Sequence, residues 1–194
     1  MKNISLTPRL FMVLLGCKPA GRHVEQHDFF FGIAYSLHEL IPEIKNFWPD
    51  SGDRIHIDGW REINHVEGYE IQVVDRNSEH NFFLEQKNKL FFLNLGGYQA
   101  NKFEEQHYTL LTVKETSALA LNEAKKTLFF QKNQFLDAKS HVDDKYGIDV
   151  DELYQIEDLL TPIQKETYHI RITPNTEVKQ DPIALGYLKL SLLK

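Results

Sequence analysis

Residues 16–27 read GCKPAGRHVEQH, and residues 96–107 read GGYQANKFEEQH. The two stretches share glycine, alanine, glutamate, glutamine and histidine at matching places, and each matched pair is 80 residues apart (96 − 16). A repeat with so long a period indicates two copies of one supersecondary unit. The sequence therefore predicts two pseudo-symmetric halves. The segments that flank the repeated stretch indicate which strands and helices each half contains.

Around the first copy, hydrophobic patterns predict strands over residues 10–15 and 25–34, a helix that opens at Ser36, and strands over 55–58 and 69–74. The first strand is apolar at every position, which is typical of a strand buried on both faces. Each half is thus predicted as strand, strand, helix, strand, strand. The fold class is α+β, with antiparallel sheets and the helices on one face.

Beyond the helices the spacing between the copies changes. His56 and Asp58 match His141 and Asp143, which lie 85 residues later (141 − 56). Residues 149–160 are then expected to form the strand that copies 69–74. We place the first repeat at residues 1–87, the second repeat at 88–162 and a strand-forming tail at 163–194, with strands over 168–172 and 187–192.

Length and charge exclude several classes of protein. A chain of 194 residues can bury a full core. Its net charge is −6 without a run of like charge, which argues against a nucleic-acid partner. No stretch reaches the roughly 20 apolar residues of a membrane-spanning helix, which argues against a membrane partner. Residues 10–17 look like a short signal peptide, but their internal copy at 90–97 favours a strand in both places, so we expect a cytoplasmic protein.

Several blocks of the sequence also carry a family resemblance. They are LFMVLLGCKPAGRHVEQHDFFFGIA (10–34), FWPD (47–50), HIDGWREI (56–63), LFFLNLGGY (90–98) and SHVDDKYGIDVDELYQIED (140–158). Together they resemble a bacterial family known as domain of unknown function 1543 (DUF1543), which occurs in one or two copies per chain. The resemblance implies the tandem arrangement. It implies no activity, cofactor or catalytic residue.

Polar positions kept in both copies are the candidates for function. On a strand, residues i and i+2 share a face, so glutamate and histidine, or histidine and aspartate, become neighbours. Imidazole nitrogens and carboxylate oxygens are common ligands of zinc, iron and manganese, and such pairs also serve as acid–base pairs. The pairs are Glu25 with His27 and His56 with Asp58, and then Glu105 with His107 and His141 with Asp143. The candidate metal ligands are His27, His56, His107 and His141.

Two interpretations of these pairs stay open. In the first, the protein binds a small ligand or a metal ion through them, with or without catalysis. In the second, they are structural hydrogen bonds in a non-catalytic interaction module, and His27 is a core-edge residue on the strand face of Phe29 and Phe31. Neither interpretation names a cofactor or a reaction, and both are compatible with a homo-oligomer.

The repeated loop has the spacing of a phosphate-binding loop. Gly16 and Gly21 are followed by the cation Arg22, and the second copy of the loop ends in Lys102. No serine or threonine follows for magnesium, and the next element is predicted as a strand, so nucleotide hydrolysis is excluded. The loop is left with two interpretations: Arg22 and Lys102 bind a small anion, or they are solvated surface cations.

Overall fold

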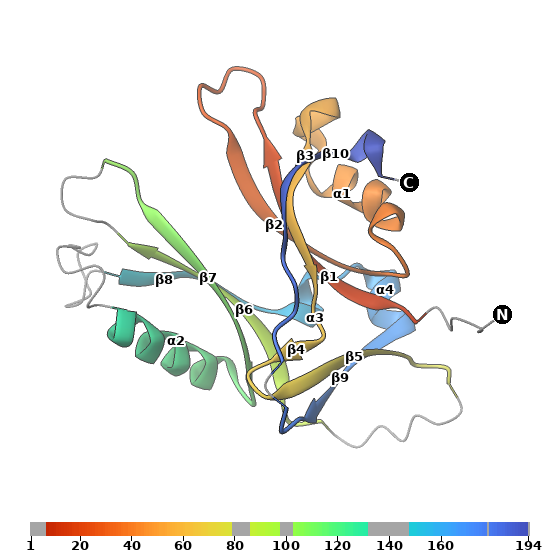
Figure 1. Cartoon of the computed structure of the whole chain (residues 1–194), viewed down its shortest axis with the longest axis vertical. Helices are drawn as coiled ribbons and strands as arrows, with labels where there is room; N and C mark the ends of the chain where they lie inside the picture. The colour runs from red at the N-terminus through yellow and green to blue at the C-terminus, as the bar shows by residue number, and fades with distance from the viewer. Residues whose placement is uncertain (1–6, 79–85, 98–102, 132–147, 178, 194) are drawn as a thin grey trace. The chain divides into compact units, whose positions relative to one another are not determined.

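The computed structural model describes residues 7–78, 86–97, 103–131, 148–177 and 179–193 (Figure 1). The chain forms two compact units, Met1–Phe82 with Leu159–Lys194, and Phe83–Asp158. We call them the first and the second unit. Both combine antiparallel sheets with helices, which confirms the predicted α+β class. No helix in the described part of the chain is long and apolar enough to cross a membrane.

The main sheet of the first unit is built around one buried strand. The strand order is β10-β3-β1-β2, and every neighbouring pair is antiparallel. The strands are β1 (Arg9–Cys17), β2 (Gln26–Ala34), β3 (His56–Glu62) and β10 (Ala184–Lys189). The strands predicted over 10–15, 25–34 and 55–58 therefore lie side by side, with the hairpin partner β2 on one side of β1 and β3 on the other.

The helical segment between β2 and β3 starts differently from the prediction. A 3₁₀ turn, η1 (Leu37–Leu40), precedes α1 (Ile41–Phe47), and a second 3₁₀ segment, η2 (Pro49–Arg54), follows. Pro42 stands at the start of α1, where its missing N–H costs no helical hydrogen bond. The α-helix therefore begins about one turn later than Ser36.

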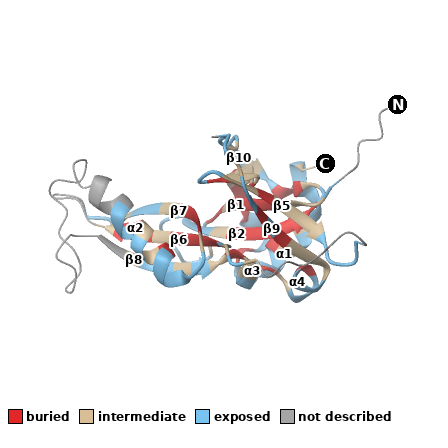
Figure 2. Ribbon diagram, turned by 90° about the horizontal axis from the view of Figure 1, so that it is seen from below, coloured by how far each residue is buried: buried red, intermediate tan, exposed pale blue. Residues whose placement is uncertain are grey.

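The two faces of β1 are both buried, as its uniformly apolar sequence predicts (Figure 2). Val13 and Leu15 belong to a core cluster with Leu40 of η1 and Ile44 of α1, so this face is covered by the helical segment. On the other face Leu10 is 1% exposed. Since side chains alternate along a strand, the even-numbered residues of β1 point away from α1.

A second, smaller sheet completes the first unit. Its order is β4-β5-β9, with a tight turn at Glu67 and Gly68, both in the left-handed region with φ of 49° and 80°. The segment that precedes β9 holds two short helices, and β10 gives way to a 3₁₀ turn where a strand was expected to continue. The bounds are β4 (His65–Val66), β5 (Tyr69–Asp75), α3 (Ile156–Leu159), α4 (Pro162–Thr167), β9 (Tyr168–Pro174) and η3 (Leu190–Leu192).

The second unit repeats the arrangement of β2, β1 and β3. Its sheet has the order β7-β6-β8, again antiparallel throughout. Ala120 and Ala124 of its helix are fully buried, 80 residues after Leu40 and Ile44 (120 − 40; 124 − 44). The elements are β6 (Lys89–Gly97), β7 (Gln106–Lys114), α2 (Ser117–Gln131) and β8 (Ile148–Gln155).

The predicted spacing after the second helix is wrong. β3 places His56 opposite Gly16 of β1, whereas β8 places Asp149 opposite Gly96 of β6. The offset between equivalent residues is therefore 93 (149 − 56) and not 85. The strand expected over 149–160 ends at Gln155 and is the counterpart of β3, not of β5.

With this offset, the residue of the second unit that is equivalent to Asp58 is Asp151 and not Asp143. Both aspartates stand at an irregularity of the pairing, after Ile57 and Val150 respectively. The sequence comparison instead selected His141 and Asp143 because they repeat the H-x-D pattern of the first half. His141 and Asp143 lie outside the described residues.

Gln164 ties α4 to the helical segment of the first unit. Its side-chain amide donates to the carbonyl of Ile33 at 3.0 Å and to the carboxylate of Glu43 at 2.9 Å. Burial raises the pKa of Glu43, and the hydrogen bond from Gln164 offsets part of this rise. The folded state therefore holds the Glu43 proton more tightly than the unfolded state does.

This shift predicts a pH dependence of stability. The contribution of Glu43 is fully present below the pKa of an unfolded glutamate and is lost as pH rises through the raised folded pKa. Glu43→Gln cannot ionise, so its free energy of unfolding should improve relative to the native chain between acidic and neutral pH. Urea unfolding at both pH values measures the difference. An equal difference at the two pH values would contradict the assignment.

Candidate functional site

The predicted pairs of the first unit meet over a glycine. Gly16, in the central strand, is paired with His27 of β2 on one side and with His56 of β3 on the other. Adjacent strands lie about 4.8 Å apart, so a side chain at the middle position would stand between the two imidazoles. A Cβ atom on Gly16 would collide with Asp58 Oδ2 and would lie 2.5 Å from His56 Nε2. The missing side chain is therefore what lets the polar groups converge.

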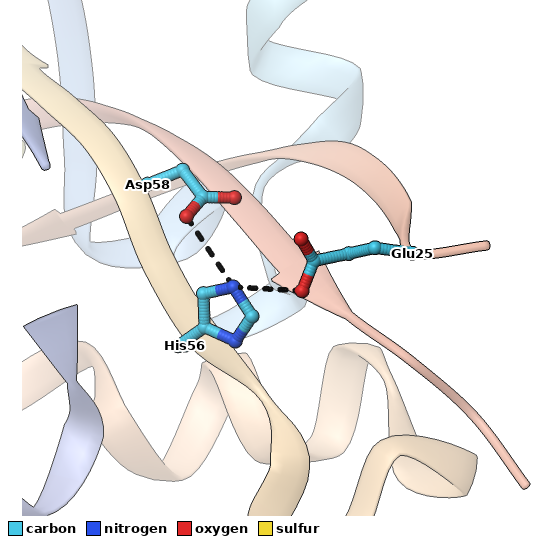
Figure 3. Close-up of side chains that lie close together, drawn as sticks. All are labelled: Glu25, His56 and Asp58. Carbon is cyan, nitrogen blue, oxygen red and sulfur yellow. Dashed lines mark ion pairs between the residues drawn. The ribbon is translucent and has the colours of Figure 1, made fainter. Parts of the chain in front are cut away.

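The convergence brings together four side chains that we call the first cluster. Nε2 of His56 lies 3.2 Å from Oε1 of Glu25 and 3.3 Å from Oδ1 of Asp58 (Figure 3). Nε2 of His27 lies 3.1 Å from Oδ2 of Asp58 and 3.9 Å from Oε2 of Glu25. The members of the first cluster are Glu25, His27, His56 and Asp58.

A β-bulge places Asp58. The pairing of β1 with β3 runs from Leu14 opposite Gly59 directly to Leu15 opposite Ile57, so Asp58 is an extra residue on β3. Bulges bend a strand and change the direction of a side chain, and they are frequent beside functional sites. Here the bulge brings the Asp58 carboxylate over Gly16.

His56 is held in one orientation and one tautomer. Its side chain is 4% exposed, and its Nδ1 lies 3.1 Å from the carbonyl oxygen of Arg54. Because a carbonyl can only accept, Nδ1 carries the hydrogen and donates it. The Tyr187 ring of β10 covers the imidazole with a centroid separation of 4.3 Å. Nε2 is buried against the carboxylate oxygens of Glu25 and Asp58, and Oδ2 of Asp58 is buried against Nε2 of His27.

A second histidine–aspartate pair in the same unit shows what a fully satisfied pair looks like. The Asp181 carboxylate accepts from the backbone N–H groups of Asn64 at 2.7 Å and His65 at 2.9 Å, and it lies 3.1 Å from Nδ1 of His65. Its side chain is 3% exposed. This pair is explained by structural hydrogen bonding alone.

The second unit holds a smaller group that we call the second cluster. Nδ1 of His107 lies 3.4 Å from Oδ2 of Asp151, and its Nε2 lies 3.9 Å from Oε2 of Glu105. A Cβ atom on Gly96 would collide with Asp151 Oδ2 and would lie 2.6 Å from Glu105 Oε1. The members of the second cluster are Glu105, His107 and Asp151.

Of these residues, Asp151 was missed by sequence comparison. No local pattern singles it out, because Val142-Asp143 matches Ile57-Asp58 as well as Val150-Asp151 does. The register of β8 on β6 shows the equivalence directly.

The residues of the predicted anion loop are not brought into either cluster. Gly21 has a φ of 76°, which favours glycine, and the N–H of Arg22 donates to the carbonyl of Pro19 at 3.3 Å to close a turn. The Arg22 side chain is exposed and makes no ion pair among the described residues. Lys102 lies outside the described residues.

Two surface hollows of the first unit lie away from the first cluster. Each has a volume of about 420 Å³. One is lined by residues that include Arg9, Glu62 and Arg171, and the other by residues that include Lys45 and Lys189. Neither includes a member of the first cluster. A single ion needs no cavity of that size.

The fold and the first cluster define a class of domain. It is an α+β unit in which a glycine of the central strand gathers histidines and carboxylates from the strands on both sides. Residues 22–73 match the model of the family described as "Domain of Unknown Function (DUF1543)", so this segment is similar to that family. The segment contains all four members of the first cluster. Since the match ends before the second unit, the two-copy form of the family stays a prediction.

A solved structure shares the fold. The chain is similar to the crystal structure of a protein Il1583 from Idiomarina loihiensis, with a TM-score of 0.61 and 18% sequence identity. The similarity covers 94% of this chain and 98% of that chain. At this identity the likeness concerns the fold alone. No curated protein matches the sequence.

Proposed function

We propose that the protein binds a divalent transition-metal ion, of the class of Zn²⁺, Fe²⁺ and Mn²⁺, in the first unit. The ligands are Nε2 of His56 and the carboxylates of Glu25 and Asp58, whose candidate ligand atoms all lie within 4.8 Å of one another. Nitrogen and anionic oxygen donors are the usual set for these ions. His27 stands beside them as a further donor.

The single observation that carries this proposal is the state of His56. Its Nδ1–H is committed to the Arg54 carbonyl, so Nε2 is the nitrogen left to bind an ion, and it lies within 3.3 Å of two carboxylate oxygens. Lone pairs and negative charges that converge in a buried place repel one another unless a cation lies among them. Donation of the other ring N–H to a backbone carbonyl is also the usual arrangement of a metal-bound histidine.

The competing explanation is that a second proton occupies Nε2 of His56 and makes the first cluster a structural ion-pair network. That explanation accounts for the charge, but it gives no reason for the glycine at position 16, whose missing side chain leaves the space in which the donor atoms meet. The His65–Asp181 pair shows that this chain builds a structural pair with every donor aligned.

The proposed site is open on one side. The Glu25 side chain is 42% exposed and that of His27 is 48% exposed, whereas His56 is enclosed. An ion held there is reachable from solvent and keeps room for water or a small molecule, as in sites that leave one coordination position open. This geometry supports a bound ligand and assigns no reaction.

Cys17 does not contribute to the site, although it follows Gly16. Its side chain is buried and its sulfur donates to the carbonyl of Ser51 at 3.9 Å. Burial raises the pKa of this thiol, with a smaller opposing effect of the Arg54 charge. Metals bind the thiolate, which is disfavoured here.

Calorimetric titration of the full chain with Zn²⁺ tests the proposal. The native chain should bind zinc at the first cluster, and His56→Ala should lose one equivalent of tight binding, with affinity at that site lowered by more than about 100-fold. His23→Ala is the matched control, because His23 is exposed and belongs to neither cluster. It should leave the titration unchanged.

Two results would contradict the proposal. One is a native chain that takes up no Zn²⁺, Fe²⁺ or Mn²⁺ at the first cluster, which would favour the structural network and with it the non-catalytic interaction module. The other is a His56→Ala chain that binds as tightly as the native one. Circular dichroism of each variant shows whether the fold has been kept.

A further inference from the structure

We infer that the second unit binds its own cation through Glu105, His107 and Asp151, and that this site prefers a harder ion, of the class of Mn²⁺, than the first cluster does. The inference rests on the proposed function, because it extends the same construction to the other unit. Its test uses variants of the second cluster, so the inference and the proposed function can fail separately.

The first step is that the construction is the same. Gly96 stands in the central strand opposite His107 of β7, as Gly16 stands opposite His27. The bulge on the third strand falls at Asp151, the counterpart of Asp58. In both units a Cβ on the glycine would collide with the aspartate Oδ2, so both glycines keep open the space where donor atoms meet.

The second step is that the donors differ. The first cluster has a second imidazole, that of His27, beside its three proposed ligands, whereas the second cluster has one imidazole and two carboxylates in all. The residue paired with the central glycine on the third strand is His56 in the first unit and Asp149 in the second. Fewer nitrogen donors shift the preference from zinc toward ions that favour oxygen ligands, such as Mn²⁺ and Mg²⁺.

The third step is that the surroundings are more polar and enclose no imidazole. Asn94 occupies the place that Leu14 holds in the first unit, opposite the residue after the bulge. Its amide donates to Glu152 at 2.8 Å and lies 3.3 Å from Nδ1 of His107. His107 is 51% exposed, close to the 48% of its counterpart His27, and the second cluster has no enclosed imidazole like that of His56, which is 4% exposed. Hard ions keep several bound waters and suit such an open site.

Manganese binding by the full chain, followed through the electron paramagnetic resonance signal of free Mn²⁺, tests the inference. The His56→Ala chain, in which the first cluster is disabled, should still bind one Mn²⁺. Adding Asp151→Asn to it should weaken that binding by about tenfold or more, as loss of a ligand does. Glu104→Gln is the matched control, since Glu104 is exposed and lies next to Glu105 outside the cluster.

The outcomes separate the two proposals. The inference is overturned if His56→Ala binds no Mn²⁺, or if Asp151→Asn binds it as tightly as its parent. Zinc bound by Asp151→Asn but not by His56→Ala supports the proposed function whatever the manganese result. Should Asp151→Asn fail to fold, Glu105→Gln removes another ligand of the same cluster and carries the same expectation.

Discussion

Gly16→Ala is expected to abolish metal binding by the first cluster while the chain keeps its fold. The new methyl carbon would collide with Asp58 Oδ2 and lie 2.5 Å from His56 Nε2. Both contacts are with side chains of the first cluster, so the methyl group displaces the donor atoms. We expect the affinity for Zn²⁺ to fall by more than about 100-fold in calorimetric titration, because a displaced ligand costs at least as much as the loss of a residue that hydrogen-bonds to a ligand.

Gly96→Ala is the matched control for this prediction. It adds the same methyl group at the equivalent position of the second unit, where it would collide with Asp151. It should leave zinc binding by the first cluster unchanged and weaken manganese binding by the second. Native zinc affinity in Gly16→Ala would show that the glycine cradle is not where the ion binds. Circular dichroism and the thermal midpoint of the metal-free chains should stay close to those of the native protein.

Asp181→Ala is expected to produce the largest loss of stability among single substitutions outside the core. The buried carboxylate accepts from two backbone N–H groups and lies against the His65 ring, and its loss leaves these donors without a partner. Removing one side of a buried charged network costs about 3 kcal/mol. Urea unfolding monitored by tryptophan fluorescence measures the change in the free energy of unfolding.

The nearby pair Glu177–Lys179 provides the control for Asp181. Both side chains are exposed, so Glu177→Ala should leave the unfolding curve where it is, although the hydrogen bond from Lys179 and its charge lower the pKa of Glu177. A loss of stability in Asp181→Ala no greater than in Glu177→Ala would contradict the role of the Asp181 hydrogen bonds. Asp181 also precedes β10, which carries Tyr187 over His56, so its loss should weaken zinc binding as well.

The sequence predicts the strands of both halves because their patterns are local. Uniform apolarity marks β1, and the repeated glycine and E-Q-H residues mark the hairpin in each half. Adjacency within a pair, such as Glu25 with His27, also follows from strand geometry. What local patterns cannot show is that β3 pairs with β1 on the side opposite β2, which is what brings His56 and Asp58 to Glu25 and His27.

The spacing error in the second half has a physical origin as well. The register of a third strand is set by its hydrogen bonds to the central strand and by the bulge, and neither leaves a signature in residue type alone. The H-x-D pattern at His141 and Asp143 therefore looked equivalent to His56 and Asp58, although the strand with the right register begins at Ile148. The repeat shows that a glycine is kept at the centre of each half. Why it is kept, to leave space for the donor atoms, can be seen only once the neighbouring strands are in place.

The measurement that bears most directly on the metal site is an anomalous difference map from a crystal of the native chain grown with Zn²⁺, recorded at the zinc absorption edge. We predict a peak over Gly16, bonded to Nε2 of His56 and to carboxylate oxygens of Glu25 and Asp58. A fully ordered first cluster without such a peak, with Nε2 of His56 hydrogen-bonded to a carboxylate instead, would contradict the account.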